Sequence, residues 1–590
     1  VTMASTLAVT GNVDFNGDLD VDGTTNLDVV DVDGAVNFAA DVTLANGADL
    51  ITASAGTSNF RAGVNAGNSI ASGGNYNVVV GDEAGTAITT GDDNVLVGYS
   101  AGDAITTGTR NVAVGTGAAG TNVSGDYNVA VGYESLTTST ASQNTALGFR
   151  SLRSDTTGAD NVAIGRSALQ ENTSASNNVA VGHLSLKNNT TGTQNVAVGA
   201  LALDANTTAS YNTAVGYNAL TANTTGADNT AVGRTALENN TTADNNTAVG
   251  KAALAQNTTG ASNTALGSLA LNLNTTGISN TAVGKSALGA NTTANANTAV
   301  GYNSLTANTT GTENTAVGTE ALNATITGSY NTAVGRSALL LTTGDHNTAV
   351  GRIALRTNSS GANNTALGSR SMYSNSSGDN NTAVGVNALD ANTTADNNTA
   401  VGHAALTANT TGTANTAVGA SAGDSLTTAS ELSAFGADAG GGVTTGVGNT
   451  YIGSKAGNYV VASTTGNYNT IVGSYSKTTA AASAYQIVLG HNVTGNADSS
   501  LCFGTAATDS AIAFGATSIT APSDVRLKED IQDETIGLDF INALRPVTFL
   551  WKKEKDIPEN LTAHKAGSEV RAMNGKHNHG FIAQEVKATI

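Results

Sequence analysis

The stretch NTAVGYNALTANTTGAD, Asn212–Asp228, is followed by near copies of itself. The next copies begin at Asn229, Asn246, Asn263 and Asn280. The period is 17 residues, and about 25 such units run from Asn77 to about Gly490. Two of them, the units that begin at Asn128 and Asn331, are one residue short. A fixed period of this kind predicts a repeat architecture in which each unit packs on its neighbours.

The repeat can be numbered from its asparagine, position one, to position seventeen. Positions two to four (Thr/Val, Ala, Val) predict a short strand that the glycine at position five ends. Alanine and leucine at positions eight and nine predict a second short strand. Asn-Thr-Thr-Gly, positions twelve to fifteen, predicts a turn with left-handed backbone and local side-chain hydrogen bonds. We expect Thr/Val, Val and Leu inside, and the alanines of positions three and eight outside.

Two strands and two turns in 17 residues predict one coil of a parallel β-solenoid. Helical repeats need about 33 residues, and Thr, Asn and Gly are poor helix formers. Stacked coils rise about 4.8 Å each. The expected fold is therefore all-β, a solenoid or β-roll with a small α+β segment at its C-terminal end. Because an outward stripe of small apolar residues favours packing against identical neighbours, we expect a parallel homotrimer.

Composition changes mark three regions. Residues 1–60 alternate apolar and polar residues and predict a β-rich shaft, residues 61–519 hold the solenoid, and residues 520–590 bring charged residues and the only tryptophan, Trp551. We expect the chain to be a fragment whose last region is truncated. Asp18, Asp20 and Asp22 resemble the start of a calcium loop, but the loop's glutamate is replaced by Val29. We therefore expect no metal ion, and no cofactor.

The net charge of −20 argues against nucleic acid and anionic membranes as partners. No stretch approaches the roughly 18 apolar residues of a membrane-spanning helix. Cys502 is the only cysteine, which excludes an intrachain disulfide framework.

Three motifs stand in the last region: SDVRLKEDI (523–531), LRPVTFLWK (544–552) and HGFIAQEV (579–586). Together they resemble the intramolecular chaperone domain found at the C-terminus of endosialidase-type phage tail spikes and fibres. The resemblance implies a domain that aligns three chains and then cuts itself off beside the motif serine. It also implies that Ser523 is the nucleophile and Lys528 the general base.

A serine hydroxyl needs an adjacent base, and a lysine becomes one only when burial or a nearby cation lowers its pKa. Arg526 lies two residues from Lys528 and supplies such a cation. The alternative is that Ser523 caps a helix whose first turns hold Glu529 and Asp530. The only enzymatic activity expected is a single self-cleavage, with no external substrate.

The repeats resemble, in architecture, the head repeats of trimeric autotransporter adhesins, through NVAVG at 111–115 and 128–132. The first interpretation is a homotrimeric phage tail fibre, located in the virion, that binds a tail or baseplate protein and a host-surface glycan or protein. The alternative is a bacterial surface adhesin or appendage protein. A polysaccharide-degrading spike is disfavoured, because the repeat offers no pair of catalytic carboxylates.

Position six, just after the glycine, often carries aromatic or basic residues. On a solenoid these residues form an edge that could contact glycans, and the alternative is a solvated turn. The candidate surface-contact residues are Tyr133, Phe149, Arg166, Tyr217, Arg234, Tyr302 and Arg336.

Overall fold

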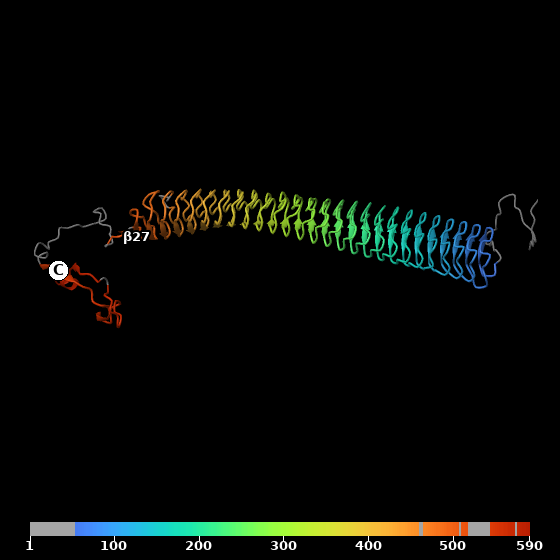
Figure 1. Cartoon of the computed structure of the whole chain (residues 1–590), viewed down its shortest axis with the longest axis horizontal. Coiled ribbons are helices and arrows are strands. Elements are labelled where there is room, and N and C mark those ends of the chain that lie inside the picture. The colour runs from blue at the N-terminus through green and yellow to red at the C-terminus, as the bar shows by residue number, and fades with distance from the viewer. Residues whose placement is uncertain (1–53, 459–463, 507–508, 517–542, 573–574, 590) are drawn as a thin grey trace, which may run out of the picture. The chain divides into compact units, whose positions relative to one another are not determined.

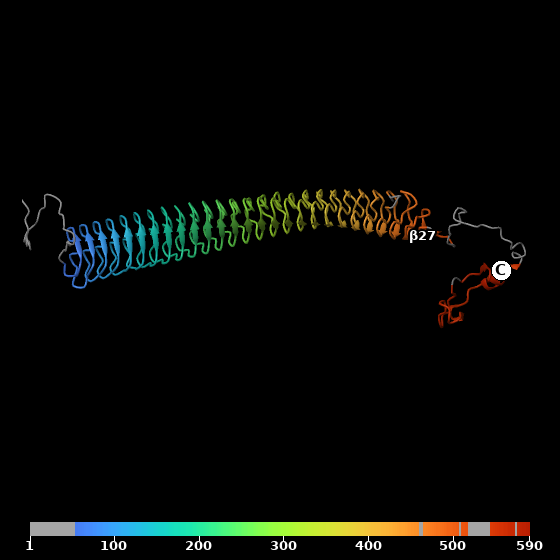
Figure 2. The same cartoon turned by 180° about the vertical axis from the view of Figure 1, so that it is seen from behind.

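A computed structural model describes residues 54–458, 464–506, 509–516, 543–572 and 575–589. It divides into two units, Val1–Asn295 and Ala296–Ile590. In each unit short strands lie side by side, one from each turn of the chain (Figure 1), and the view from behind shows the same stacking (Figure 2). The predicted all-β solenoid with 17-residue coils is confirmed.

The strands of the first unit all pair in parallel. They are β1 (Phe60–Ala62), β2 (Val78–Val80), β3 (Val95–Val97), β4 (Val112–Val114), β5 (Val129–Val131), β6 (Thr145–Leu147), β7 (Val162–Ile164), β8 (Val179–Val181), β9 (Val196–Val198), β10 (Thr213–Val215), β11 (Thr230–Val232), β12 (Thr247–Val249), β13 (Thr264–Leu266) and β14 (Thr281–Val283).

The second unit continues the pattern, and only its last solenoid strand is antiparallel to its neighbour. Its solenoid strands are β15 (Thr298–Val300), β16 (Thr315–Val317), β17 (Thr332–Val334), β18 (Thr348–Val350), β19 (Thr365–Leu367), β20 (Thr382–Val384), β21 (Thr399–Val401), β22 (Thr416–Val418), β23 (Ser433–Phe435), β24 (Thr450–Ile452), β25 (Thr470–Val472), β26 (Ile487–His491), β27 (Ser500–Thr505) and β28 (Ser510–Ala513). Its C-terminal part holds β29 (Val547–Phe549), the 3-10 helix η2 (Glu554–Asp556), β30 (Asn578–Gly580) and α2 (Ala583–Thr589).

The inside and outside of the strand are the reverse of what the sequence predicted. In β10, Ala214 is fully buried, while Thr213 and Val215 on either side of it are partly exposed. Ala219 and Leu220, positions eight and nine, are also fully buried. The coil interior is therefore filled by two alanines and one leucine. The larger β-branched side chains project from the opposite face of the sheet.

The second strand expected at positions eight and nine is absent from the described coils. Asn218 and Leu220, positions seven and nine, both have positive φ, 55° and 52°, so the chain turns there. Coils still bond to each other at this corner, because Leu220 N–H donates to the carbonyl of Ala236 at 3.0 Å. Left-handed backbone occurs at positions seven, nine and seventeen, but Asn223, in the predicted Asn-Thr-Thr-Gly turn, is not among the positive-φ residues.

Two buried files, at positions one and twelve, close the coils, and in most coils both positions are asparagine. The side-chain amides of Asn212 and Asn223 both donate to the carbonyl oxygen of Gly226, each at 2.9 Å. Asn223 also donates to Oδ1 of Asn206 in the previous coil at 3.1 Å. All of these asparagines are fully buried. Their side-chain amides are satisfied because the same hydrogen bonds recur from coil to coil. The local side-chain hydrogen bonds predicted for the turn are confirmed.

The glycine at position five ends every regular strand. Gly216 has φ 139°, and a Cβ built on it would lie 2.5 Å from the carbonyl oxygen of Gly233. Only glycine fits a backbone of this kind, both sterically and conformationally. The residue that follows, position six, is carried to the outside at the edge of the sheet.

Candidate functional site

The candidate surface residues at position six lie where the sequence placed them, on the outer edge of the solenoid. Tyr133, Phe149, Tyr217 and Tyr302 are exposed by 42–52%, and Arg166, Arg234 and Arg336 are exposed as well. The file is mixed rather than continuous, because small residues such as Thr116, Ala200 and Ser268 interrupt it.

Tyr133 and Phe149, both members of the predicted set, contact each other. Their rings are stacked on adjacent coils, with centroids 5.4 Å apart and planes 11° from parallel. The guanidinium of Arg150 lies 5.0 Å from the Phe149 ring centroid and 5.9 Å from that of Tyr133. The result is a small aromatic platform with a cation over it.

Glu134 joins this platform to two arginines. It forms ion pairs with Arg150 at 2.9 Å and with Arg153 at 3.0 Å. A hydrogen bond from Tyr133, together with the two guanidinium groups, lowers the pKa of Glu134. The cluster therefore presents stacked rings, cations and an ionised carboxylate on one exposed edge. Such groups can stack against a sugar ring and hydrogen-bond its hydroxyls.

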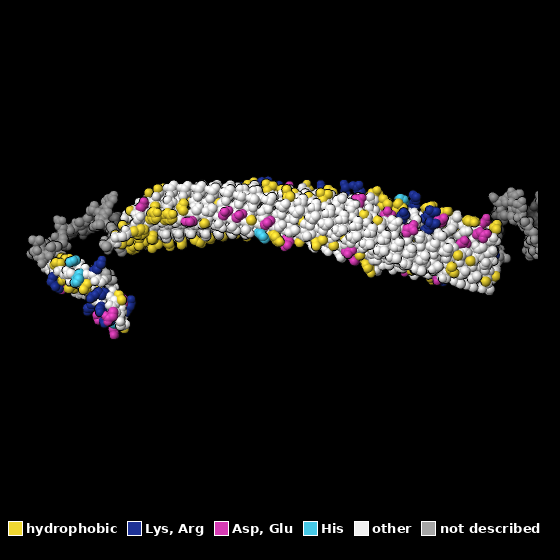
Figure 3. Space-filling model, viewed as in Figure 1, with side chains coloured by type: hydrophobic (Ala, Val, Ile, Leu, Met, Phe, Trp, Pro, Cys, Tyr) yellow, Lys and Arg dark blue, Asp and Glu magenta, His cyan; other side chains and the backbone are white. Residues whose placement is uncertain are grey.

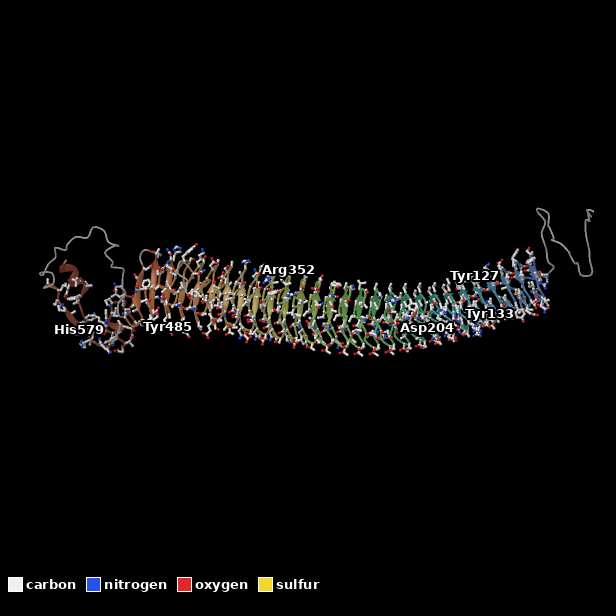
Figure 4. All side chains as sticks on the ribbon, turned by 90° about the horizontal axis from the view of Figure 1, so that it is seen from above. Tyr127, Tyr133, Asp204, Arg352, Tyr485 and His579 are labelled. Carbon is white, nitrogen blue, oxygen red and sulfur yellow. The ribbon has the colours of Figure 1, made fainter. Side chains whose placement is uncertain are left out.

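Position seventeen forms a second edge, which the sequence analysis missed. Tyr127 precedes β5 and Tyr133 follows it, and both side chains lie outside the coils (Figure 4). Arg110 donates to the Tyr127 hydroxyl and lies 5.3 Å from its ring centroid. Stacked pairs recur in this file: Tyr330 with His346 at 4.8 Å and Tyr468 with Tyr485 at 5.3 Å. The tyrosine that often precedes the leading asparagine was the available signal.

A third cluster combines positions seven and ten in the second unit. Arg356 donates to the Tyr373 hydroxyl at 3.1 Å, and the Arg370 guanidinium lies 4.5 Å from the Tyr373 ring centroid. Arg370 also pairs with Asp390 at 3.0 Å, and this hydrogen bond raises the pKa of Arg370. The cluster resembles the Tyr133 platform in chemistry, and it uses positions seven and ten, the positions that Arg150 and Arg153 occupy beside that platform.

Ser523 and Lys528, the predicted dyad, lie outside the described residues, as does the whole motif 523–531. The other two motifs are described and meet each other. β29 pairs antiparallel with β30, so that Val547 faces Gly580 and Phe549 faces Asn578. Arg545 and Glu585 form a two-pronged ion pair, 3.1 and 2.6 Å. β29 begins directly after Pro546.

Apolar side chains near this hairpin line a cavity. Phe549 and Trp551 pack edge to face at 5.3 Å, and Trp551, Ile557, Pro558 and Leu561 line an apolar cavity of about 360 Å³. Among the described residues, no group of three or more His, Cys, Asp or Glu side chains could hold a metal ion. His579 instead lies 3.1 Å from the Thr548 hydroxyl.

Comparison with known families identifies this last region. Residues 523–590 match the family model described as chaperone of endosialidase. No curated protein and no solved structure matches the chain. The segment that matches this family model follows, in the sequence, a β-solenoid of 17-residue coils. This arrangement is the one expected of a phage tail fibre or spike with a C-terminal chaperone.

Within the described residues, none of the helices has the length and apolar character needed to cross a membrane.

Proposed function

We propose that this chain is the homotrimeric attachment fibre of a bacteriophage tail. The observation that carries the proposal is the order of its parts, a long β-solenoid followed by a chaperone-of-endosialidase segment. A solenoid of near-identical coils can pair with another copy one coil out of register at little cost. A non-repetitive segment at one end sets the register once, and assembly proceeds from it.

Self-cleavage then removes the aligning segment. Lys528, as the neutral amine, accepts the proton of the Ser523 hydroxyl while the serine oxygen attacks the neighbouring peptide carbonyl. The proton passes to the leaving amine, an ester remains on the serine, and water hydrolyses that ester. No external substrate enters this sequence of steps.

Attachment is assigned to the edges of the solenoid rather than to its interior. The stacked pair Tyr133 and Phe149, with Arg150 and Glu134 beside it, offers groups that suit a glycan of the host surface. One end of the fibre would bind a tail or baseplate protein. A bacterial surface adhesin built from the same parts is the second candidate, supported by the likeness of the NVAVG units to adhesin head repeats.

The test uses the protein expressed from its complete gene. Light scattering should give three chains per particle, and a denaturing gel should show cleavage beside Ser523. Ser523→Ala and Lys528→Ala should each leave the chain uncut, whereas Ser510→Ala, which changes a serine outside the motif, should not affect cleavage. A stable monomer would contradict the fibre, and cleavage that persists in both dyad variants would contradict the dyad. Labelling of virions, rather than bacterial cells, would distinguish the two candidates.

A further inference from the structure

The outward face of the solenoid sheet consists of two parallel files of side chains. In each regular coil, positions two and four point away from the interior, while the alanine between them is buried. Where position four is leucine it is clearly exposed, as at Leu147 (44%) and Leu266 (47%). Because the strands pair in register, side chains of the same position stand one above another.

Neither file contains a charged residue. From β2 to β14, position two is always Val or Thr, and position four is Val, Leu or Ile. From β15 to β26, position two is Thr, Ser or Ile, and position four is Val, Leu, Phe or Ile. The edges on either side of these files do carry charged residues. Position six includes Arg166 and Lys251, and position seventeen includes Asp93 and Asp160. The charge-free strip is thus bordered by charged and aromatic residues.

The face becomes more apolar toward the end of the solenoid. Phe435, Ile452, Val472 and Leu489, all at position four, are exposed. Figure 3 shows hydrophobic side chains gathering over the coils near β27. A contiguous exposed apolar surface of this extent is rare on proteins that stay monomeric.

The area of the face is sufficient for stable association. If each side chain exposes about 40 Å², two from each of the 13 strands β2–β14 present on the order of 1,000 Å², above the roughly 800 Å² per partner of a typical stable interface.

We propose that this face, positions two and four of the coils, is the surface by which copies of the chain pack against each other. A second copy is the occupant that the observations favour, for two reasons. Its strands have the same spacing, so each coil finds an equivalent coil opposite. The attached family segment is a chaperone, whose assembly role the proposed function already uses. The inference rests on the proposed homotrimer and names its interface.

Contact through this face also limits the electrostatic repulsion between copies of the chain. Copies that each carry a net charge of −20 repel one another. Contact through a charge-free strip keeps the acidic groups at the rim, where water and salt screen them. Tyr133 and Phe149, at position six, then stand beside the interface and stay accessible to a ligand.

Disulfide trapping tests the face directly. Thr230→Cys puts a thiol on the strip, and Thr242→Cys puts one on the exposed Asn-Thr-Thr turn of the same coil. The native Cys502 is buried and stays out of the reaction. Under mild oxidation, Thr230→Cys should give linked dimers on a non-reducing gel, and Thr242→Cys should give none.

Charge insertion provides a second measurement. Lysines at Val215, Val232 and Val249 should lower the temperature at which the trimer dissociates by about ten degrees or more. Lysines at Thr225, Thr242 and Thr259, exposed positions in the same coils, should lower it by less than about three degrees. Circular dichroism before heating should show the same strand content in both variants.

The outcomes separate the interface from the function. If the protein is a trimer but Thr230→Cys does not cross-link, the proposed interface is wrong. The same holds if both lysine variants behave alike. Neither result contradicts the proposed fibre function. A wild-type chain that is monomeric by light scattering overturns both.

Discussion

The backbone N–H of Asn229 donates to the side-chain oxygen of Asn212, one coil earlier, at 3.0 Å. The same bond recurs between successive leading asparagines, for example from Asn212 to Asn195 and from Asn246 to Asn229. Each of Asn195, Asn212 and Asn229 also reaches across its own coil to the carbonyl of position fifteen. One buried side chain therefore closes its coil and joins it to the next, which is why the position does not vary in the regular coils.

Removal of one member of the second asparagine file should destabilise its coil. Asn189 donates to Asn172 Oδ1 at 3.0 Å and to Gly192 O at 2.9 Å, and accepts from Asn206 at 2.9 Å. Asn189→Ala leaves buried partners unpaired, at a cost of about 2 kcal/mol or more. Hydrogen exchange at the amides of this coil should speed up at least about tenfold. Asn188→Ala, next to it but not buried, should change exchange little; equal effects would contradict the file's role.

Asp155 occupies an asparagine position of this file and makes the coil sensitive to pH. Burial raises its pKa to about 6, against an ordinary value of 3.8, although Ser139 and Asn172 donate to its carboxyl group. The folded coil therefore prefers the protonated form. Its stability is highest below pH 3.8 and falls as pH rises through about 6, by up to about 3 kcal/mol.

Asp155→Asn should remove this dependence. At a pH of about 7.5 the variant's coil should exchange its amides more slowly than the wild type, and the two should converge as pH falls toward about 4. Asp160→Asn, an acid on the exposed edge of the same coil, serves as the control and should show no such convergence. A variant less stable than the wild type at the higher pH would rule out a destabilising buried carboxylate.

Gly250 should not tolerate a side chain. Its φ is 135°, and an added Cβ would lie 2.6 Å from the carbonyl carbon and oxygen of Gly267. Gly250→Ala should cost about 3 kcal/mol or more, seen as faster exchange in its own coil and both neighbours. Gly289→Ala is the matched change, because the nearest atom is 3.3 Å away and another coil carries Ala255 at this position. We expect its exchange to match that of the wild type.

The ion pair between Arg545 and Glu585 links the two described chaperone motifs, so its reversal should impair assembly. Glu585→Lys places two cations together and should reduce the yield of trimer and of cleaved chain on a denaturing gel. Adding Arg545→Glu restores opposite charges and should recover most of both. Failure of the double variant to recover would show that the residues act separately.

Loss of the stacked rings should weaken attachment without affecting assembly. Tyr133→Ser with Phe149→Ser removes the platform under Arg150, and binding of labelled fibre to host cells should drop about tenfold or more, since aromatic stacking contributes about 1–3 kcal/mol. Phe514→Ser, which changes an exposed aromatic residue outside the position-six file, is the control and should leave binding unchanged. Unchanged binding by the double variant, with the trimer intact, would move the receptor site elsewhere.

The repeat predicted the strand, its end at glycine and the parallel stacking, because strand propensity and turn chemistry act locally. Which face of the strand is inside could not be read from Thr-Ala-Val alone. A period of two gives two choices, and the preference for burying the larger side chain selected the wrong one. The width of the coil decides, since Ala214, Ala219 and Leu220 already fill the interior between the two asparagine files.

The turn at positions seven to nine could not be predicted from the sequence for a similar reason. Leucine rarely adopts positive φ, yet Leu220 does so here, and the cost is met by full burial and by bonds to the next coil. The exposed edge at position six was predictable because aromatic and basic residues often follow the glycine that ends the strand. The edge at position seventeen also carries aromatic residues, such as Tyr127 and Tyr330, but the sequence pattern was not interpreted as a second edge. The predicted roles of Ser523 and Lys528 remain predictions.

The two short coils, which begin at Asn128 and Asn331, show how this chain varies in length. Each lacks one residue, yet Asn144 still donates to Asn128 and Asn347 to Asn331, both at 2.9 Å. The missing residue is absorbed in the turns and the next coil is placed as usual. Each regular coil forms the same backbone and asparagine bonds with the coil that follows, so a gene duplication or deletion of one unit leaves these bonds satisfied. The reach of the protein can thus evolve in single steps of about 4.8 Å, by recombination between its own repeats.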